Sequence, residues 1–410
     1  MTTDSIMQAV LVSTRFVHYT ACLVVPAAWS VDRLVVGSDL PDDARRDWRR
    51  IRNWIVSMAL PVALVSGAAW IVLVAMNMSG QTFSDALGHA LPLVWHRTAI
   101  GRVWRIRLSL WCVAAIFSFA AVLFNRLDRR DILAWLALAS SMALAASLAW
   151  AGHGVDGNSP GFHLTADAMH LCLSSLWPGG LFPFALYLRS LRRAAHPQTA
   201  AFLADATRRF STISLFVVPL LIATGLINTF IMLPGPMALF NSEYGVVLLA
   251  KIVLVIATIA IGAVNLRRHR PALMSSALQG RTRQGTRFSQ EDVARRVQSL
   301  LDLGKSRGYL CCEELNEQLP DVVVSPDKLD TLLMGIDEMG IKLIDEVDIG
   351  KFQKAPNSVT TLPRTYAAKA LVPPPSDAAA ALVRNVIVET ILTVLVVGLV
   401  AVLGLLAPPR

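Results

Sequence analysis

The sequence predicts an all-α membrane protein, an eight-transmembrane-helix bundle with a small soluble helical insert between the seventh and eighth helices. Three observations lead to this fold class. Charged residues make up only 16% of the chain, and its mean hydropathy is +0.52. Eight apolar runs each reach about 18 residues, the length that crosses a bilayer as a helix. A single long polar stretch, 270–383, separates the last two runs.

The eight runs are expected to be helices, because a spanning segment must satisfy its backbone hydrogen bonds internally. Their approximate ranges are 7–31, 54–77, 103–124, 132–151, 166–188, 212–233, 245–265 and 385–407. We therefore divide the chain into helices one to seven (1–269), a cytoplasmic segment (270–383) and helix eight (384–410).

Arginine is distributed unevenly among the loops. The odd-numbered loops carry most of it, whereas the fourth and sixth loops contain neither Arg nor Lys. The positive-inside rule then places the odd loops in the cytoplasm and both termini in the periplasm. The net charge of +9 reflects this orientation and gives no reason to expect direct nucleic-acid binding. The start, MTTDSIMQ, lacks the basic region of a cleavable signal peptide.

The polar stretch contains an acidic segment, about 291–350, between Gly/Ser/Arg-rich and Pro-rich linkers. Its periodicity predicts helices in EDVARRVQSLLDLGK, CEELNEQL and SPDKLDTLLMGIDEMG. In the third, Ser325 is the expected N-cap and Gly340 the expected C-cap. IKLIDEV predicts a short strand.

Three histidines gather in AGHGVDGNSPGFHLTADAMHL, residues 151–171, between the fourth and fifth apolar runs. His163 and His170 are seven residues apart, so they share a face if this segment is helical. Asp167 lies between them and can orient an imidazole by a hydrogen bond. His153, at the end of helix four, completes a set of candidate metal ligands at the periplasmic rim. Each of the three could instead be an ordinary polar residue at the membrane interface.

A further candidate ligand, His18, lies in the first apolar run within RFVHYTACL. An ionisable residue inside a span is by default a functional candidate. Cys22 lies four residues later and shares its helix face. His18 could instead hydrogen-bond a neighbouring helix, and Cys22 could be a small packing residue. Imidazole and sulfur ligands at an oxidising face suit copper; zinc fits imidazole too, whereas calcium and magnesium prefer oxygen.

Several segments in order resemble the CopD family of inner-membrane copper-resistance proteins. They include RFVHYTA, TAIGRVWRIRLSL, WAGHG and ADAMHLCLSSLWPGGL, and SEYGVVLLAKIVLVIATIAIGAVNLRRHRPAL in the seventh run. The resemblance implies an eight-helix bundle in the bacterial inner membrane, a copper ion of either oxidation state as the bound metal, and a periplasmic CopC-like copper-binding protein as partner. The family's outer histidines map to His18, His153 and His170, and His163 is added from its spacing. Pro178 departs from the family pattern and should bend helix five.

The insert resembles region 1.1 of housekeeping sigma factors through GKSRGYL, ELNEQLP and DEMGI. The promoter-binding regions of sigma factors are missing, so the chain is not a sigma factor. An acidic module of this kind could dock a basic cytoplasmic partner, or it could be a recruited domain that the loop tolerates.

The function expected from these features is copper transport and homeostasis, with copper bound at the periplasmic side and passed toward the cytoplasm. Membrane lipids are the other expected partner. No phosphate-binding GxxxxGK[ST] motif occurs, and no enzymatic activity is expected. Two alternatives remain at this stage: a haem-carrying b-type membrane redox protein with histidine axial ligands, and a copper-sensing receptor that signals through the insert.

Overall fold

The computed structural model describes residues 3–124, 130–151, 160–193, 199–269, 298–299, 301–306, 309–311, 342–344, 377–406 and 409. The chain divides into two compact units. Unit 1 comprises Met1–Ala277 and Val372–Arg410, and unit 2 comprises Leu278–Leu371.

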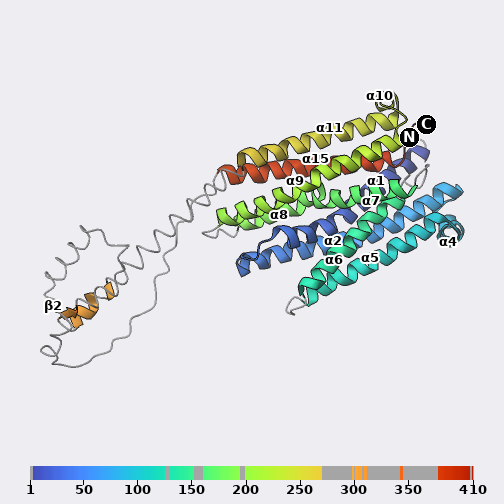
Figure 1. The fold of residues 1–410 in the computed structure, drawn as a ribbon. Helices are drawn as coiled ribbons and strands as arrows, with labels where there is room; N and C mark the ends of the chain where they lie inside the picture. The colour runs from blue at the N-terminus through green and yellow to red at the C-terminus, as the bar shows by residue number, and fades with distance from the viewer. Residues whose placement is uncertain are drawn as a thin grey trace. The chain divides into compact units, whose positions relative to one another are not determined.

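Unit 1 is a bundle of long helices (Figure 1). The described residues contain eight helical stretches long and apolar enough to cross a membrane, which confirms the predicted fold class. The helices concerned are α1 (Thr3–Ser30), α2 (Asp42–Ser79), α5 (Ala99–Leu123), α6 (Arg130–Ala146), α7 (Pro160–Leu176) with α8 (Pro178–Arg193), α9 (Thr199–Met232), α11 (Glu243–Val264) and α15 (Asp377–Leu403).

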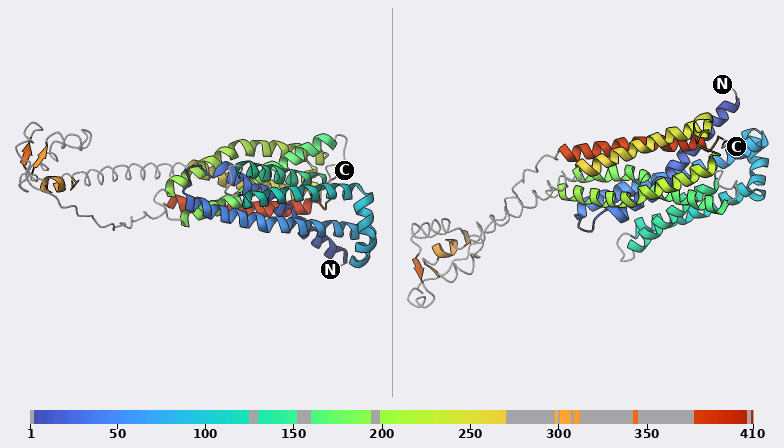
Figure 2. Two further views of the ribbon diagram at one scale, coloured as in Figure 1. Left: turned by 90° about the horizontal axis from the view of Figure 1, so that it is seen from below. Right: turned by 45° about the horizontal axis from the view of Figure 1, so that its top comes forward.

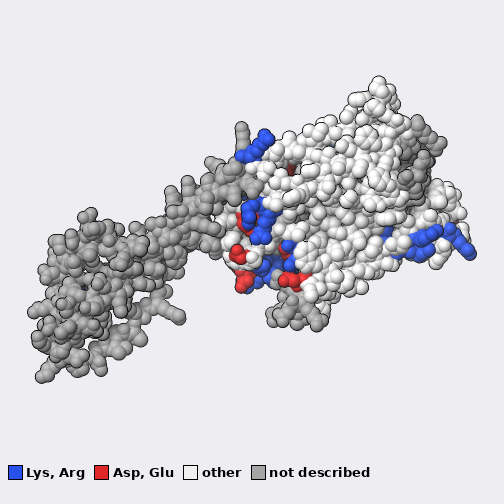
Figure 3. All heavy atoms as spheres, in the orientation of Figure 1, with Lys and Arg blue, Asp and Glu red and all other residues white. Residues whose placement is uncertain are grey.

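Both chain termini lie at the same end of the bundle, which we call the terminal end (Figure 1). We call the opposite end the basic end, because the connection between α1 and α2 and the arginines near it lie there. Figure 3 shows acidic and basic side chains gathered around the basic end and a smaller group of basic side chains at the terminal end, while most of the visible face of the bundle between the two ends is uncharged. An uncharged belt of this kind is what a lipid-facing surface requires.

Several helices begin well before the apolar runs that predicted them. The run at 54–77 belongs to α2, which already begins at Asp42. Two aspartates in its first turn favour this early start through the helix dipole. The arginines expected in the first loop therefore lie largely on α2. Arg52 is only 4% exposed and pairs with Asp32 at 2.8 Å, with its guanidinium over the Trp29 ring.

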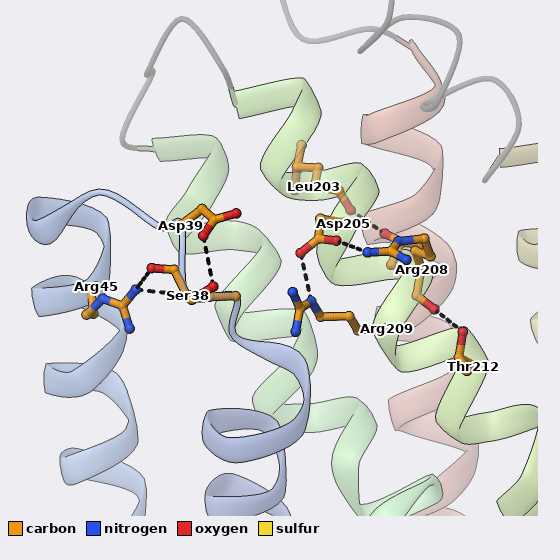
Figure 4. A network of polar contacts seen from close by, with 10 residues as sticks. Ser38, Asp39, Arg45, Leu203, Asp205, Arg208, Arg209 and Thr212 are labelled. Atoms are coloured by element: carbon orange, nitrogen blue, oxygen red, sulfur yellow. Dashed lines mark hydrogen bonds and ion pairs between the residues drawn. The ribbon is translucent and has the colours of Figure 1, made fainter. Parts of the chain in front are cut away.

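Polar contacts hold the connections at the basic end (Figure 4). Arg45 donates to the Ser38 carbonyl at 2.6 Å, and Asp205 on α9 accepts from Arg208 and Arg209 at 2.7 and 2.8 Å. A Cβ on Gly37 would lie 3.1 Å from Asp205 Oδ2. The glycine thus allows the α1–α2 connection to approach α9 closely.

The fifth span is interrupted at Pro178, where the sequence predicted a bend. Helix α7 ends at Leu176 and α8 begins at Pro178. Proline has no N–H and its ring clashes with the preceding turn, so it is tolerated as the first residue of a helix and not inside one. The break lies six residues after His170, near the middle of the span.

The segment between the second and third spans is helical, where the sequence suggested a loop. It contains α3 (Phe83–Asp85), a π-helical turn η2 (Ala86–Ala90) and α4 (Leu91–Arg97). Figure 2 shows this segment lying across the terminal end of the bundle. A second short helix, α10 (Ala238–Asn241), precedes α11. Thr98 and Ser242 cap α5 and α11 by accepting from the backbone N–H three residues on.

Helix α1 lies at the centre of unit 1. It packs against α2, α6, α7, α8 and α15, and two large clusters of buried apolar side chains include its residues. Beyond α1, α7 packs on α9, and α11 packs on α15. A polar residue on α1 is therefore surrounded by helices on most sides, which matters for His18.

Unit 2 holds two short strands, β1 (Tyr309–Cys311) and β2 (Lys342–Ile344), paired in parallel with Tyr309 opposite Lys342. Strand β2 lies within the IKLIDEV segment that predicted a strand. Residues 301–306 are helical, as EDVARRVQSLLDLGK predicted. The other two helices predicted for the insert lie outside the described residues.

Candidate functional site

His18 is a buried residue of α1 whose two ring nitrogens have different partners. Nδ1 lies 3.0 Å from the Ala63 carbonyl oxygen and 3.1 Å from Ser66 Oγ. Nε2 lies 2.7 Å from Arg107 Nη2. A carbonyl can only accept and a guanidinium can only donate, so the proton is on Nδ1 and the lone pair is on Nε2. His18 therefore offers its acceptor atom to Arg107.

Arg107, on α5, joins three polar groups in the middle of the bundle. It is 2% exposed. Its Nη2 also lies 3.7 Å from Cys22 Sγ, and its Nη1 donates to Ser147 Oγ at 2.7 Å. The Cys22 sulfur is itself 3.6 Å from His18 Nε2. We call His18, Cys22, Arg107 and Ser147 the central cluster.

Aromatic rings and a cavity surround the central cluster. The His18 ring lies 5.5 Å from the Trp70 ring and 5.5 Å from the Trp104 ring, centre to centre. A cavity of about 510 Å³ adjoins it, lined among others by His18, Cys22, Arg107 and His96 of α4. The cluster is thus enclosed by apolar walls on one side and opens on a cavity on the other.

His170, on α7, has its imidazole oriented differently. Its Nδ1 lies 3.0 Å from Thr224 Oγ1 of α9. The Thr224 hydroxyl proton is used on the Leu220 carbonyl at 2.9 Å, so Thr224 accepts from Nδ1–H. This leaves Nε2 as the acceptor atom of His170. Gly225 gives the ring room, because a Cβ there would lie 3.3 Å from His170 Cε1.

His163 and Asp167 lie on the same helix nearer the terminal end. His163 is 6% exposed, and its Nδ1 is buried without a hydrogen-bond partner among the described residues. Asp167 accepts from Asn228 Nδ2 of α9 at 3.3 Å, and Asn228 Oδ1 is likewise buried and unpaired there. We call His163, Asp167, His170 and Asn228 the terminal cluster. Two of its buried polar atoms, His163 Nδ1 and Asn228 Oδ1, have no hydrogen-bond partner among the described residues, which makes the cluster a candidate binding site.

Tyr19 is close to residues of both clusters. This tyrosine follows His18 on α1 and is close enough to Asp167 and to Arg107 to interact electrostatically with both. Its ring also lies 5.9 Å from the Trp70 ring. Tyr19 therefore lies near polar residues of both the terminal and the central cluster.

The three described histidines among the four predicted to be ligands do not lie in one group. His163 and His170 lie on α7 as their spacing predicted, and His18 lies in the central cluster with α2 and α5. His153 lies outside the described residues. Among the residues that the structure does describe, no three His, Cys, Asp or Glu side chains are close enough to hold one metal ion together. A metal would have to use fewer ligands here, or His153 as well.

Known proteins share much of this sequence. Residues 3–161 match the model of the copper resistance protein D-like, N-terminal domain, and residues 204–296 match that of copper resistance protein D. Copper resistance protein D of Pseudomonas syringae pv. tomato is 31% identical over 215 residues, 52% of this chain and 67% of that protein. The chain belongs to the copper resistance protein D family.

Two further relatives match different shares of the chain. Copper transport protein CutJ of Bacillus subtilis (strain 168) is 29% identical over 169 residues, 41% of this chain and 30% of CutJ. Inner membrane protein YebZ of Escherichia coli (strain K12) is 24% identical over 265 residues, 62% of this chain and 82% of YebZ. No solved structure matches the chain.

The insert also has a counterpart. Residues 291–361 match the model of sigma-70 factor, region 1.1. Both resemblances seen in the sequence are thereby confirmed, and the sigma-like region extends past the predicted boundary at residue 350.

The sequence analysis missed three polar residues that lie at or near the two clusters. They are Arg107, Asn228 and Lys251, and Lys251 is close enough to Asp167 to interact with it electrostatically. The rule that an ionisable residue inside a span is a functional candidate would have found Arg107 and Lys251. Asn228 had no such signal, because amides are common near helix ends.

Proposed function

We propose that this protein transports copper across the inner membrane, binding it at the periplasmic side through histidines and passing it toward the cytoplasm. Membership of the copper resistance protein D family supports copper as the cargo. The observation that carries the proposal is the state of the α7 histidines. His163 Nδ1 is buried and has no hydrogen-bond partner among the described residues, and His170 keeps Nε2 as an acceptor, so each imidazole has a ring nitrogen available to an ion inside a largely apolar bundle.

The proposed orientation places the terminal end in the periplasm. The arginines concentrated at the basic end support this, since positive residues favour the cytoplasmic side. His153, His163 and His170 then receive copper at the outer side. A periplasmic CopC-like copper-binding protein is the proposed donor.

The proposed route leads from the terminal cluster to the central cluster. His163 and His170 are separated by seven residues, roughly 10 Å at the rise of an α-helix. We therefore treat them as two successive binding sites for copper and not as one. Tyr19 and Asp167 continue the polar path toward His18. A path of weak sites suits transport, because each ion must leave as well as bind.

The insert is proposed to dock a basic cytoplasmic partner. Its acidic residues outnumber its basic ones between 310 and 350, and its match to an acidic module of sigma factors supports the same role. Transport itself is assigned to unit 1, where the polar clusters lie.

The transport proposal is tested by cellular copper content at fixed external copper. Cells with the protein should accumulate more copper than cells without it, and replacing His18, His153 and His170 together by Ala should abolish the difference. His89→Ala is the matched control, because His89 is an exposed histidine of η2 outside both clusters. Copper accumulation by the triple variant equal to that of the wild type would refute the ligand assignment.

A further inference from the structure

We infer that His18 Nε2 and Cys22 Sγ form a binding site for one soft monovalent cation of the Cu(I) class, and that Arg107 occupies this site when it is empty. The inference rests on the proposed copper transport, and it adds a defined central site, an oxidation state and a displaceable residue.

The spacing of the two ligand atoms fits a single bridging ion. His18 Nε2 and Cys22 Sγ are 3.6 Å apart on successive turns of α1. Metal–nitrogen and metal–sulfur bonds of about 2.0 and 2.3 Å can span this distance with a bent N–metal–S angle, which leaves a position for a further ligand from the adjoining cavity. Two ligands are few for zinc, which takes four. The thiolate selects soft ions such as Cu(I).

Arg107 places a positive group where the ion would lie. Its Nη2 is 2.7 Å from His18 Nε2 and 3.7 Å from Cys22 Sγ, so one cationic N–H group faces both ligand atoms. Among the described residues, the hydrogen-bond partners of Arg107 are His18, Cys22 and Ser147, and none of them is a carboxylate of the kind that usually pairs with a buried guanidinium. The guanidinium is therefore held by neutral acceptors, which makes it easier to displace than an arginine in an ion pair.

The cavity beside the cluster provides the space for this displacement. It has a volume of about 510 Å³ and is lined by Arg107 as well as by both ligand residues. The arginine side chain is long and unbranched, so its head can move into the cavity while its stem stays on α5. The Trp104 ring, 5.3 Å from Arg107 Cζ, is a further partner for the cation.

Binding by Cys22 exchanges one positive charge for another. The S–H bond of the Cys22 thiol breaks, a bond from sulfur to the monovalent ion forms, and the proton leaves to water in the cavity. No electron is transferred. The net charge of the buried cluster is the same before and after, so the apolar surroundings are not asked to hold an additional charge.

The test uses the full-length protein in detergent or lipid nanodiscs with Ag(I), a soft monovalent ion that does not change oxidation state under these conditions. The reference variant has Cys112, Cys172, Cys311 and Cys312 replaced by Ser, so that Cys22 is the remaining thiol. Equilibrium dialysis and the ultraviolet thiolate-to-metal absorption measure binding. We expect the reference variant to bind one Ag(I) ion through Cys22 and to show the thiolate-to-metal absorption. Its affinity for Ag(I) should rise about tenfold per pH unit, because binding releases one proton.

Three substitutions in the reference variant complete the test. Cys22→Ser should remove one bound ion and the absorption, and His18→Gln should weaken binding at least about tenfold, while the control His89→Gln should change neither. Arg107→Leu should strengthen binding about tenfold, because the competing group is gone. Retained binding in Cys22→Ser, unchanged affinity in His18→Gln, or lost binding in a correctly assembled Arg107→Leu protein would each overturn the inference.

The outcome is separable from that of the transport proposal. If the protein changes cellular copper but Cys22→Ser binds Ag(I) like the reference, the central site is wrong and transport stands. If the protein leaves cellular copper unchanged while Cys22 binds Ag(I) as described, the transport proposal fails and the site stands as a binding site.

Discussion

A histidine ring has two nitrogens, and the partner of one decides what the other can do. His170 donates its Nδ1–H to Thr224 in a hydrogen bond, and the buried Lys251 is close enough to interact electrostatically with the imidazole. His18 gives its proton to the Ala63 carbonyl, and its lone pair is claimed by Arg107. The two histidines thus differ in their surroundings: Nε2 of His18 is bonded to Arg107, whereas no hydrogen bond to Nε2 of His170 is seen among the described residues.

The role of Thr224 is tested by Thr224→Val. The substitution keeps the shape of the side chain and removes the acceptor for His170 Nδ1–H. Copper affinity should fall about tenfold, as it does when a hydrogen-bond partner of a metal-binding histidine is lost. Titration of the purified protein with copper measures this.

Thr212→Val is the matched control, because Thr212 is an exposed threonine of the same helix that bonds only to its own turn. An affinity in Thr224→Val equal to that of Thr212→Val would show that His170 does not depend on this hydrogen bond.

At the residue scale, the sequence predicted local geometry and missed contacts between distant segments. The spacing of His163 and His170 gave their common helix, and the spacing of His18 and Cys22 gave their proximity. Arg107 is 89 residues from His18 in the chain, and helix periodicity carries no information on such a pair. The same limit applies to Asn228 and Asp167, which are 61 residues apart.

At the scale of helices, a polar contact joins Asn265, the residue directly after α11, to α15. Asn265 Nδ2 donates to Glu389 Oε1 at 2.6 Å, and Asn385 Nδ2 donates to Asn265 Oδ1 at 2.9 Å. Glu389 is 2% exposed, and Asn265 is 8% exposed. Such hydrogen bonds between transmembrane helices stabilise their pairing, because the alternative is an unsatisfied polar group in an apolar surrounding.

This contact predicts the effect of Asn265→Leu. The substitution removes both hydrogen bonds and leaves the Glu389 carboxyl without its partner, which should cost about 1–2 kcal/mol of stability. Thermal unfolding in detergent should show a midpoint lower by a few degrees. The control Val264→Ala changes an exposed neighbour on the same helix and should leave the midpoint nearly unchanged. An equal loss in both variants would argue against a specific role for the contact.

Helix existence was predictable and helix ends were not. Hydropathy located all eight spans, because lipid imposes a minimum apolar length. It could not locate the start of α2 at Asp42, since helical structure continues into water wherever residues with good helix propensity and a suitable first turn follow. The break at Pro178 was predictable because proline acts through covalent geometry alone.

At the scale of the whole molecule, the insert is placed between two helices that are already neighbours. Helix α11 precedes it and α15 follows it, and the two pack along each other in the bundle. The bundle therefore does not need the insert to bring these helices together.

Replacing Leu278–Leu371 by a short Gly/Ser linker tests this independence. The shortened protein should reach the membrane, keep the unfolding midpoint of the full chain and support the same cellular copper content. Loss of copper accumulation with an unchanged midpoint would mean that the insert takes part in transport or its control.

The adjacency of α11 and α15 also has a practical use. Any folded domain whose own first and last residues are close together can take the place of the insert without pulling the two helices apart. A fluorescent protein exchanged for Leu278–Leu371 would follow α11 and precede α15 in the chain. Its brightness in living cells would then report how much protein is made with the exchanged domain, independently of any metal measurement.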